Sequence, residues 1–303
     1  MPKQSSQSVM MVRPKNFGFD HATAASNSFQ DESGADAVQE ISRRAVVEFD
    51  AAVGKLRANE IVVHVIEDTD TPKKPNAVFP NNWVSFHGDK VLLYPMLAEN
   101  RRLERRPEIL EILKGKGLQI NEVLDISGAE NDGKYLESTG SMVLDYENRL
   151  SYACISSRTD KDVLNQFCEL IEFKAVVFEA FDKDQVPIYH TNVLMCIGTQ
   201  YAVICLEAIL EDQRGEVTDS LTQTGHEIVP ITMDQMYSFA GNMLELVNAK
   251  GETMLVMSNT AYMSLMPDQK GALSKYAKLL SVEIPTIEKY GGGSVRCMMC
   301  RVT

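Results

Sequence analysis

The sequence has no long apolar run. Its first eight residues, Met1–Ser8, are polar, and no later segment of the 303-residue chain is apolar over the length of a signal peptide or a membrane span. We therefore expect a cytoplasmic protein that makes no use of a membrane.

Basic residues are also scarce. The chain holds 30 Lys and Arg against 42 Asp and Glu, which gives a formal net charge of −12, and the cations are scattered along the chain. Such a chain repels a nucleic-acid backbone except at a local basic patch. This charge balance argues against a nucleic-acid partner and favours a small molecule.

Paired cysteine spacings are missing as well. Of six cysteines, only Cys297 and Cys300 form a CxxC pair, and no second ligand pair accompanies them. Disulfides are rare in the reducing cytosol. We therefore expect no metal, no other cofactor and no disulfide framework.

Short β-rich segments alternate with amphipathic segments along the whole chain, and no linker divides it. The expected strands are Glu60–Glu67, Lys90–Tyr94, Gln119–Leu124, Met142–Tyr146, Leu150–Ile155, Ala175–Phe178, Tyr201–Cys205, Glu227–Ile231 and Met254–Met257. Helices are expected over Ala35–Leu56, after Thr159, after Thr232 and over Asp268–Leu280. Several strands per helix predict an α/β fold other than a plain doubly wound sheet, and the recurring spacing suits units repeated around a centre.

The strongest single feature lies near the C-terminus, where the glycine run Gly291–Gly293 precedes Cys297. Glycine tolerates positive φ and allows the backbone to approach a ligand closely, and a cysteine after such a run can face a pocket. Cys297 is therefore a candidate nucleophile. The competing interpretation is a turn followed by a buried core cysteine.

Candidate partners for Cys297 lie far away in the sequence. His190 belongs to the β-like segment Pro187–Met195, in which alternate side chains share a face, so His190 and Asn192 are expected to project together. The competing interpretation is a histidine bound to a backbone carbonyl. Glu137 lies in a small-residue bend before an apolar strand, from which a carboxylate can project into a cleft. Its competing interpretation, a glutamate exposed on a turn, is the one that the sequence alone favours.

Eight segments, taken in order, resemble one family. They are Met11–Pro14, Phe79–Trp83, Asn100–Arg106, Leu136–Ser141, Ser157–Thr159, His190–Asn192, Phe239–Asn242 and Gly291–Cys297. Together they are similar to the guanidino-group-modifying superfamily of arginine deiminases, amidinotransferases and dimethylarginine hydrolases, and most of all to an amidinotransferase-like branch described as citrulline hydrolases. The resemblance implies a five-bladed α/β propeller (pentein) of ββαβ units with a central active site. We accordingly expect a flexible tail over residues 1–8 and one catalytic domain over residues 9–303.

The resemblance also implies roles for individual residues. Cys297 matches the nucleophile of the family, His190 matches its general acid/base, and Glu137 matches the carboxylate that orients the bound group. Together they imply a covalent mechanism in which the thiolate attacks the substrate carbon and the histidine moves protons.

Arginines near these motifs are candidate substrate contacts. Arg158 falls where deiminases hold the substrate α-carboxylate, and an arginine fork can donate two parallel hydrogen bonds to such a group. One of Arg101, Arg102 or Arg105 is expected to join it. At least two members of the arginine-rich segment 101–106 are expected on a solvated helix face, and Arg13 is expected to be structural.

Two departures from the family pattern concern the substrate. Asn82 and Asn192 stand where deiminases that act on guanidinium carry aspartates, although asparagines such as Asn81 and Asn82 are also common in turns. A guanidinium is always charged and only donates hydrogen bonds, so its burial without negative partners is costly, whereas asparagine amides match a neutral ureido group in both directions. We therefore expect citrulline as substrate, with ornithine, ammonia and carbon dioxide as products.

Alternatives to citrulline hydrolysis stay open. Some family members that act on guanidino groups also carry asparagine at these positions, so an arginine deiminase-like hydrolase or an amidinotransferase is the second interpretation. The same fold occurs in a ribosome-binding factor without catalysis, so a binding protein is the third. A homo-oligomer is compatible with the sequence.

Overall fold

The computed structural model describes residues 3–24, 26–33 and 36–302, and the strands in these ranges form five three-stranded sheets. Four sheets follow the chain order: β3 (Val84–His87), β4 (Lys90–Leu93) and β5 (Glu122–Asp125); β6 (Val143–Asp145), β7 (Leu150–Cys154) and β8 (Lys174–Phe178); β9 (Met195–Ile197), β10 (Tyr201–Ile204) and β11 (Glu227–Pro230); β12 (Leu244–Val247), β13 (Thr253–Ser258) and β14 (Lys278–Val282). The fifth joins both ends of the chain: β15 (Cys300–Val302), β1 (Ser8–Arg13) and β2 (Val62–Glu67).

Helices connect and cover these strands. The α-helices are α1 (His21–Ala24), α2 (Val38–Ala58), α3 (Glu99–Arg102), α4 (Pro107–Gly115), α5 (Ser138–Ser141), α6 (Lys161–Ile171), α7 (Thr191–Leu194), α8 (Arg214–Gln223), α9 (Met233–Tyr237), α10 (Asn259–Ser264), α11 (Pro267–Ser274), α12 (Pro285–Gly291) and α13 (Val295–Met298). The 3-10 helices are η1 (Pro80–Asn82), η2 (Ser127–Asp132), η3 (Leu206–Ala208) and η4 (Glu211–Gln213).

All five sheets share one topology. In each, the middle strand pairs antiparallel with the first strand and parallel with the third. A parallel neighbour requires a crossover, and helices α2, α4, α6, α8 and α11 lie in the five crossovers. The α/β class expected from the sequence is confirmed, and each of the nine expected strands overlaps an observed one.

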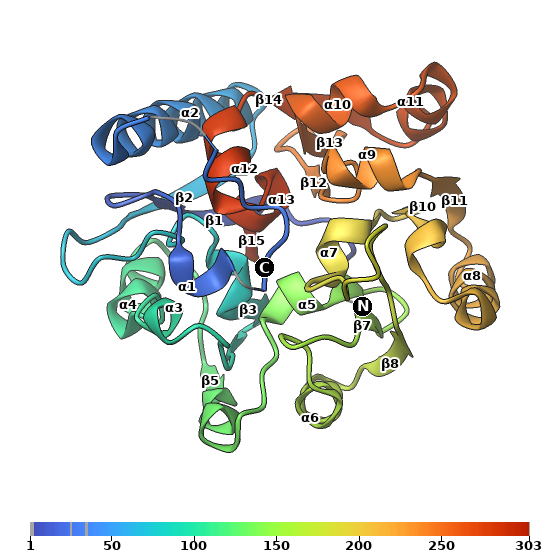
Figure 1. Ribbon diagram of the computed structural model, residues 1–303, viewed down its shortest axis with the longest axis horizontal. Helices are drawn as coiled ribbons and strands as arrows, with labels where there is room; N and C mark the ends of the chain where they lie inside the picture. Colours follow the sequence, from blue (N-terminus) through green and yellow to red (C-terminus); the bar gives the residue numbers. More distant parts are fainter. Residues whose placement is uncertain (1–2, 25, 34–35, 303) are drawn as a thin grey trace.

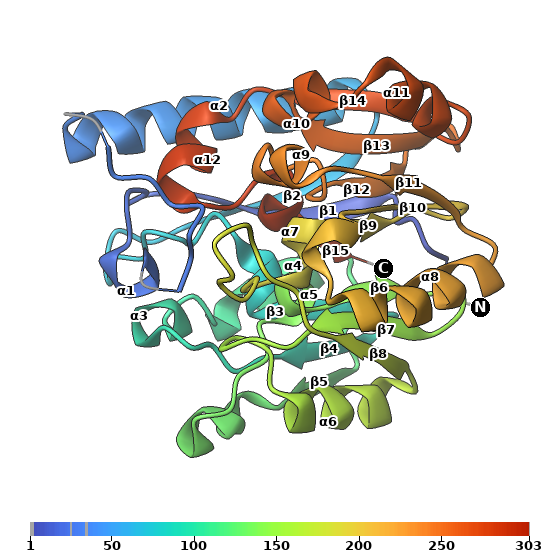
Figure 2. The same ribbon diagram turned by 45° about the vertical axis from the view of Figure 1, so that its right-hand side comes forward.

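The sheets surround a centre made of short helical segments. Figure 1 shows the long helices at the outside, with α5, α7 and α13 close to the middle. Segments α5 and η1 contact each other, as do α5 and α7, and α13 and η1. Figure 2 shows the same elements after a turn of 45° about the vertical axis, with α2 and α6 at opposite edges of the molecule. Residues far apart in the sequence therefore meet at the centre.

The long helices form for the reasons that the sequence indicates. Helix α2 buries Ile41, Ala45 and Phe49, which recur every four residues on the face toward the core. Helix α6 begins after Asp160, whose side chain accepts hydrogen bonds from the backbone amides of the first turn. It ends at Ile171, and the next residue, Glu172, has left-handed backbone angles. The expected helix over Asp268–Leu280 is wrong in its second half. Helix α11 ends at Ser274, and β14 begins at Lys278 because it pairs parallel with β13.

Part of the expected N-terminal tail packs against the domain. The Gln4 side chain is buried and donates hydrogen bonds to the carbonyl oxygens of Leu144 and Ile197 at 3.0 and 3.1 Å. Ser8 already belongs to β1, where it pairs with Val302. The expected boundary after residue 8 therefore falls inside a strand, while Met1 and Pro2 lie outside the described residues. Across the described ranges, no helix combines the length and apolar character needed to cross a membrane.

Candidate active site

The centre of the molecule is built from residues that stand just before the first strand of each sheet. Asn82 comes two residues before β3, Gly140 three residues before β6 and Asn192 three residues before β9. Asn242 comes two residues before β12, and Cys297 three residues before β15. Because the five first strands surround one centre, these positions converge there although they are spread over more than two hundred residues.

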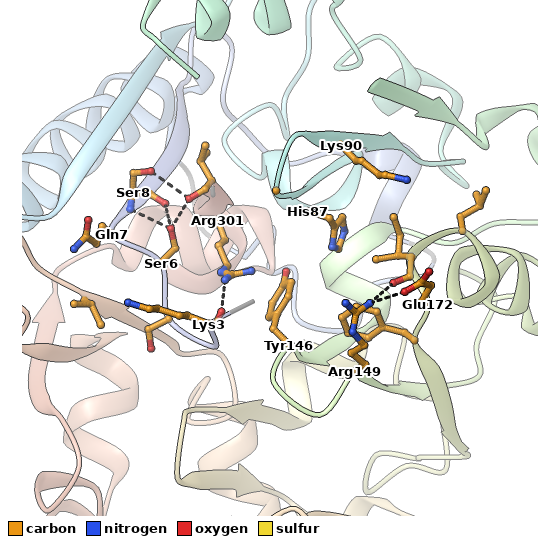
Figure 3. Close-up of a pocket in the computed structure, with 17 residues that line it drawn as sticks. Lys3, Ser6, Gln7, Ser8, His87, Lys90, Tyr146, Arg149, Glu172 and Arg301 are labelled. Atoms are coloured by element: carbon orange, nitrogen blue, oxygen red, sulfur yellow. Dashed lines mark hydrogen bonds and ion pairs between the residues drawn. The ribbon is translucent and has the colours of Figure 1, made fainter. Parts of the chain in front are cut away.

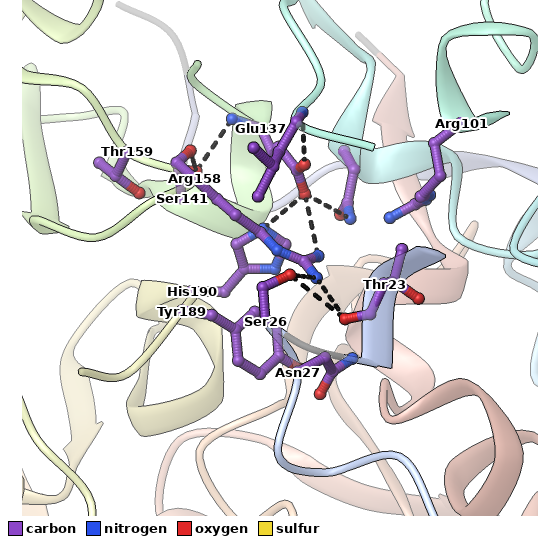
Figure 4. Close-up of polar contacts among 12 residues, drawn as sticks. Thr23, Ser26, Asn27, Arg101, Glu137, Ser141, Arg158, Thr159, Tyr189 and His190 are labelled. Carbon is purple, nitrogen blue, oxygen red and sulfur yellow. Dashed lines mark hydrogen bonds and ion pairs between the residues drawn. The ribbon is translucent and has the colours of Figure 1, made fainter. Parts of the chain in front are cut away.

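Glu137 and His190 form a buried pair at this centre. The Glu137 carboxylate is fully buried, and its Oε2 lies 2.9 Å from His190 Nε2 and 3.3 Å from Arg158 Nη1 (Figure 4). The Asn82 amide donates to the same oxygen at 3.5 Å, and the backbone amide of Leu97 donates to Oε1 at 3.2 Å. The carboxylate is thus held by four partners, so the competing interpretation of Glu137 as an exposed turn residue is wrong.

The charges of this pair follow from burial and from Arg158. Burial by itself would raise the pKa of Glu137, but the Arg158 guanidinium and the hydrogen bond from His190 outweigh it and hold this pKa well below its usual value. Burial lowers the pKa of His190 to about 4, against the pull of Glu137. His190 is therefore neutral near pH 7. An ionised carboxylate only accepts hydrogen bonds, so His190 carries its proton on Nε2 and leaves Nδ1 as a base.

Cys297 lies beside two asparagine amides. Its Sγ is 3.3 Å from Asn242 Nδ2 and 3.5 Å from Asn192 Nδ2, and the residue is 6% exposed. Asn242 is fixed in turn, because it donates to the carbonyl of Asn192 at 2.9 Å and accepts from the backbone amide of Arg296 at 3.1 Å. The sulfur therefore faces donors that stabilise negative charge, as a nucleophilic thiolate requires.

Cys300 has a different environment although it is only three residues away. Helix α13 ends at Met298, and the chain then enters β15, which turns the Cys300 thiol into the apolar core near Trp83. The thiol contacts the carbonyl of Val84 at 3.4 Å, and burial raises its pKa to about 12. Cys300 is therefore a poor nucleophile at neutral pH.

Arg158 and Arg101 line the cavity next to Cys297, but they are bound differently. Arg158 donates to Ser26 Oγ at 2.7 Å, and its guanidinium lies 5.0 Å from the ring of Tyr189. Arg101 forms a two-pronged ion pair with Glu104, both bonds at 2.9 Å. Arg158 is thus the arginine whose outer contact is a neutral hydroxyl that a carboxylate can replace.

The other arginines of segment 101–106 lie away from the cavity. Arg102 and Arg105 share the carboxylate of Glu130, and Arg106 pairs with Glu108. The expectation that at least two of these arginines are solvated is wrong, because each is at least partly buried and ion-paired. Arg13 forms a two-pronged pair with Asp50 at 2.7 Å, which agrees with a structural role.

The cavity in front of Cys297 is small. Its volume is about 20 Å³, which is room for about one water molecule. The described residues that line it are Thr23, Asn27, Asn76, Phe79, Asn82, Arg101, Arg158, Tyr189, His190, Gly291, Gly292, Gly293 and Cys297. These described lining residues include two arginines and no carboxylate. Glu137 is not among them, although it contacts the lining residues His190 and Arg158.

The glycine run serves packing around this cavity. Gly292 has φ +62°, and its carbonyl accepts a hydrogen bond from the Tyr189 hydroxyl at 2.7 Å. A Cβ on Gly291 would lie 2.7 Å from the Phe79 ring, and one on Gly292 would lie 2.6 Å from Gln30. The run is therefore needed for close contact with neighbouring side chains, as well as for the path of the chain to Cys297.

The structure changes the expectation for the His190 segment. The segment Pro187–Met195 was expected to be β-like throughout, but residues Thr191–Leu194 form helix α7, and β9 starts only at Met195. The turn is favoured because the Thr191 hydroxyl donates to the carbonyl of Ser141 and contacts Cys154. His190 and Asn192 still reach the same centre. The competing interpretation of His190 as bound to a backbone carbonyl is wrong, since its partner is Glu137.

All seven candidate residues therefore lie in or directly around one cavity: Cys297, His190, Glu137, Asn82, Asn192, Arg158 and Arg101. Sequence reasoning did not single out Asn242, Tyr189 or Ser26 as site residues. Asn242 follows Gly241, and a Cβ on Gly241 would lie 2.3 Å from the carbonyl of Val193. The glycine therefore marks a close approach of two backbone segments directly beside Asn242. Tyr189 and Ser26 carry no comparable signal, since their contacts depend on distant segments.

Solved structures with the same fold are known. The substrate-bound N-terminal domain of ArgZ, an arginine dihydrolase from the ornithine-ammonia cycle in cyanobacteria, is 16% identical over 98% of both chains, with a TM-score of 0.75. AgrE with L-arginine is 18% identical over 98% of this chain and 40% of that one, with a TM-score of 0.76. A dimethylarginine dimethylaminohydrolase adduct with S-methyl-L-thiocitrulline is 15% identical over 99% of this chain and 100% of that one, with a TM-score of 0.65.

These TM-scores show an α/β fold that matches pentein structures. No curated protein matches the chain. The family model described as N,N dimethylarginine dimethylhydrolase, eukaryotic, matches residues 13–303, which is nearly the whole chain. The chain thus belongs to the eukaryotic N,N dimethylarginine dimethylhydrolase family, within the guanidino-group-modifying pentein superfamily that its motifs resemble, and is homologous to hydrolases of guanidino C–N bonds.

Proposed function

We propose that this protein hydrolyses a C–N bond at the terminal carbon of an arginine-related amino acid through a covalent adduct on Cys297. The observation that carries this proposal is the convergence of Cys297, His190 and Arg158 on one cavity, with Glu137 bound to both His190 and Arg158. A nucleophile, a base, an orienting carboxylate and a carboxylate-binding fork are the parts that such a reaction needs.

In this mechanism, His190 Nδ1 accepts the proton of Cys297, and the thiolate attacks the terminal carbon. The amides of Asn192 and Asn242 stabilise the negative charge, and His190 returns the proton to the nitrogen that leaves. The same histidine then takes a proton from a water molecule, whose oxygen attacks the thioester-like carbon and releases Cys297. Glu137 keeps the imidazole oriented and in the required tautomer throughout.

Arg158 is the proposed contact for the substrate α-carboxylate. Its Nη2 donates to Ser26 Oγ and to the carbonyl of Thr23, at 2.7 and 3.3 Å. The cavity of about 20 Å³ is too small for an amino acid. We therefore propose that substrate entry moves these contacts apart and that the carboxylate replaces Ser26 as the partner of Arg158.

The charges around the cavity support a neutral ureido head group, that is, citrulline. Glu137 is already neutralised by Arg158, and the charge of Arg101 is matched by Glu104. A guanidinium would add a buried positive charge to a balanced set, which is costly, whereas a ureido group would not. In the described structure Asn82 Oδ1 and Asn192 Oδ1 lack hydrogen-bond partners, and they can accept the ureido N–H groups.

The second candidate is a guanidino substrate, and the comparisons support it better than citrulline. The family model describes a dimethylarginine hydrolase. The similar structures are described as an arginine dihydrolase, a complex with L-arginine and a dimethylarginine hydrolase, and none of these is described as a citrulline hydrolase. The two head groups share the same carbon and differ in one atom. Hydrolysis of a guanidino group yields the ureido compound, so one site can handle both in sequence.

The test offers the purified protein citrulline, arginine, N,N-dimethylarginine and agmatine in separate assays and measures ammonia, dimethylamine and the amine product. Ornithine and ammonia from citrulline alone support the proposed substrate. Release of citrulline from arginine or dimethylarginine replaces it with the second candidate. Turnover that survives in Cys297→Ala contradicts the nucleophile, and absence of turnover with all four compounds leaves a binding protein of the same fold.

We also propose the finer architecture. The five sheets of identical topology are interpreted as the blades of a closed five-bladed propeller that forms a single catalytic domain, which includes Gln4 and the whole of strand β1. A cytoplasmic location and a homo-oligomer stay predictions, which fractionation of the source cells and sedimentation of the purified protein would test.

A further inference from the structure

A second, much larger cavity lies at the far ends of the strands that lead away from the active site. Its volume is about 750 Å³ (Figure 3). Strand β3 starts after Asn82 and ends at His87, which lines this cavity, and β15 starts after Cys297 and contains Arg301, which also lines it. Tyr146, directly after β6, is a third lining residue. Catalytic groups and this cavity thus occupy opposite ends of the same short strands.

The lining of this cavity is cationic although the chain as a whole is acidic. Among the described residues it holds four cations, Lys3, Lys90, Arg149 and Arg301, and the one carboxylate of Glu172. Glu172 is paired with Arg149 at 3.2 Å, and Lys90 is paired with Glu122, outside the lining, at 3.1 Å. Lys3 and Arg301 are the lining cations that have no carboxylate partner in the described structure. A concentration of positive charge in a protein of net charge −12 indicates an anionic ligand.

Arg301 is the strongest sign of such a ligand. It is 7% exposed, it makes no ion pair with a carboxylate in the described ranges, and its Nε has no hydrogen-bond partner there. Its Nη2 donates to the carbonyl of Lys3, and its guanidinium lies 3.7 Å from the centre of the Tyr146 ring. A buried guanidinium without a negative partner is costly, and an anion bound in the cavity removes that cost.

Aromatic side chains also line this cavity, and one of them, Tyr146, lies directly against Arg301. Tyr146 and Phe173 meet edge to face with ring centres 6.0 Å apart, and His87 lies 5.9 Å from the Tyr146 ring. Burial, with a smaller contribution from Arg301, lowers the pKa of His87 to about 3, so His87 adds a neutral ring to this lining. A ligand with both an apolar ring and negative groups fits this combination.

We propose that this cavity binds a phosphorylated heteroaromatic small molecule of the nucleotide class, with its phosphates on Arg301, Lys3 and Lys90 and its ring against Tyr146 and Phe173. Several converging cations favour a multiply charged phosphate over a single carboxylate. The volume lies within the roughly 300–1,000 Å³ that ligand pockets occupy. The site is independent of the proposed catalytic function, because no residue of the active-site cavity takes part in it.

The test measures binding of ATP, AMP, tripolyphosphate and adenosine to the full chain by isothermal titration calorimetry. We expect ATP and AMP to bind at least tenfold more tightly than adenosine, and ATP more tightly than tripolyphosphate. Replacing two of the proposed phosphate contacts together, Lys3→Ala with Lys90→Ala, should weaken ATP binding at least tenfold. Lys55→Ala on the exposed face of α2 is the matched control and should leave it unchanged.

Several results would overturn the proposal. The first is that ATP, AMP and tripolyphosphate all fail to bind at millimolar concentration. The second is that AMP and adenosine bind with equal affinity, and the third is that tripolyphosphate and ATP bind with equal affinity. Binding that survives the double substitution but is lost in Arg158→Ala would place the ligand in the active-site cavity instead. A crystal soaked with ATP gives an independent readout, in which phosphate density within hydrogen-bond distance of Arg301 is expected.

Discussion

The two cavities of this molecule lie at opposite ends of the same strands and differ in almost every property. The active-site cavity has about 20 Å³ of space, while the cationic cavity has about 750 Å³. Around the first, each charge has a partner of opposite sign, as Arg158 has in Glu137. In the second, Arg301 has no such partner among the described residues. Cavity volume therefore does not locate the chemistry, which depends on where reactive groups converge.

The same contrast appears between Cys297 and Cys300. Cys297 ends in the active-site cavity beside two amide donors, and Cys300 ends in an apolar core. The change from helix α13 to strand β15 between them separates their environments. We expect the reactivity of each thiol to follow the direction of its side chain at the junction of α13 and β15. Comparing the two cysteines is therefore the first test, and the one with the largest expected effect.

Replacing Cys297 with alanine is expected to lower kcat/KM by about 10⁴-fold or more, because the covalent step has no other nucleophile. Cys300→Ala is the matched control three residues away, and its kcat/KM is expected to stay within a few fold of the unmodified protein. Steady-state rates of ammonia release give both values, with circular dichroism to confirm folding. Equal losses in the two variants would show that the positions do not differ chemically.

Replacing Glu137 with glutamine is expected to lower kcat by about 10²- to 10⁴-fold, because His190 loses its orienting carboxylate. The variant also leaves the buried Arg158 unpaired, which should reduce the free energy of unfolding by about 3–5 kcal/mol. Glu111→Gln is the control, since Glu111 forms an exposed pair with Lys114 and should change little. Rates and urea unfolding measure the two effects.

The same variant tests the pKa of Glu137. Its folded pKa lies below its unfolded value of about 4.5, so the unfolded chain binds the proton first as pH falls. The stability that Glu137 contributes is therefore complete above pH 4.5 and is lost as pH falls below it. In Glu137→Gln, the free energy of unfolding should therefore decrease less below pH 4.5 than it does in the unmodified protein. An unchanged acid profile would contradict the lowered pKa.

Much of the fold could be predicted from the sequence because it is local. Apolar runs such as Leu150–Cys154 and the four-residue spacing of Ile41, Ala45 and Phe49 encode strands and helices directly. Strand β15, in contrast, has three residues and depends on pairing with β1 from the other end of the chain. Its sequence gave no signal of its own, so it was not expected.

The active site was predictable only through resemblance. Nothing local in the sequence brings Glu137 to within 2.9 Å of His190, since their contact depends on α5 and α7 meeting at the centre. Local reasoning favoured an exposed Glu137, which is wrong. It also predicted a β-like segment through Asn192, whereas the chain is extended at His190 but helical from Thr191 onward. Asn242 was not singled out because its contact with Cys297 joins the segment before β12 to the segment before β15, which belong to different sheets. The periodicity of the sequence predicts individual helices and strands. Whether the site residues meet depends on how those helices and strands pack against one another.

A third test concerns the tight packing of side chains around the small active-site cavity. A Cβ on Gly140 would lie 2.8 Å from His190 Cε1 and 2.9 Å from Asn82 Oδ1, so Gly140→Ala should displace the imidazole. A displacement of about 1 Å costs on the order of 100-fold in rate. Gly128→Ala is the control, because no atom lies within 4 Å of its added Cβ. Equal rates in the two variants would show that His190 tolerates the shift.

The smallest test compares the buried histidines, one beside each cavity. His190 has a pKa of about 4 and His87 a pKa of about 3, both lowered chiefly by burial. Between pH 6.5 and 4, the unfolded chain binds a proton at each histidine that the folded chain does not, so stability falls as pH falls, by about 1.4 kcal/mol per pH unit for each histidine.

Between pH 4 and 3, only His87 of these two histidines still contributes, because His190 is by then protonated in both states. Nuclear magnetic resonance of the imidazole protons should show His190 titrating before His87 as pH is lowered. His87→Asn should remove one of the two contributions to the slope of unfolding free energy against pH while leaving kcat/KM within a few fold, because His87 lies in the cationic cavity and not at the catalytic centre. A large loss of activity in this variant would instead reveal coupling between the two cavities along β3.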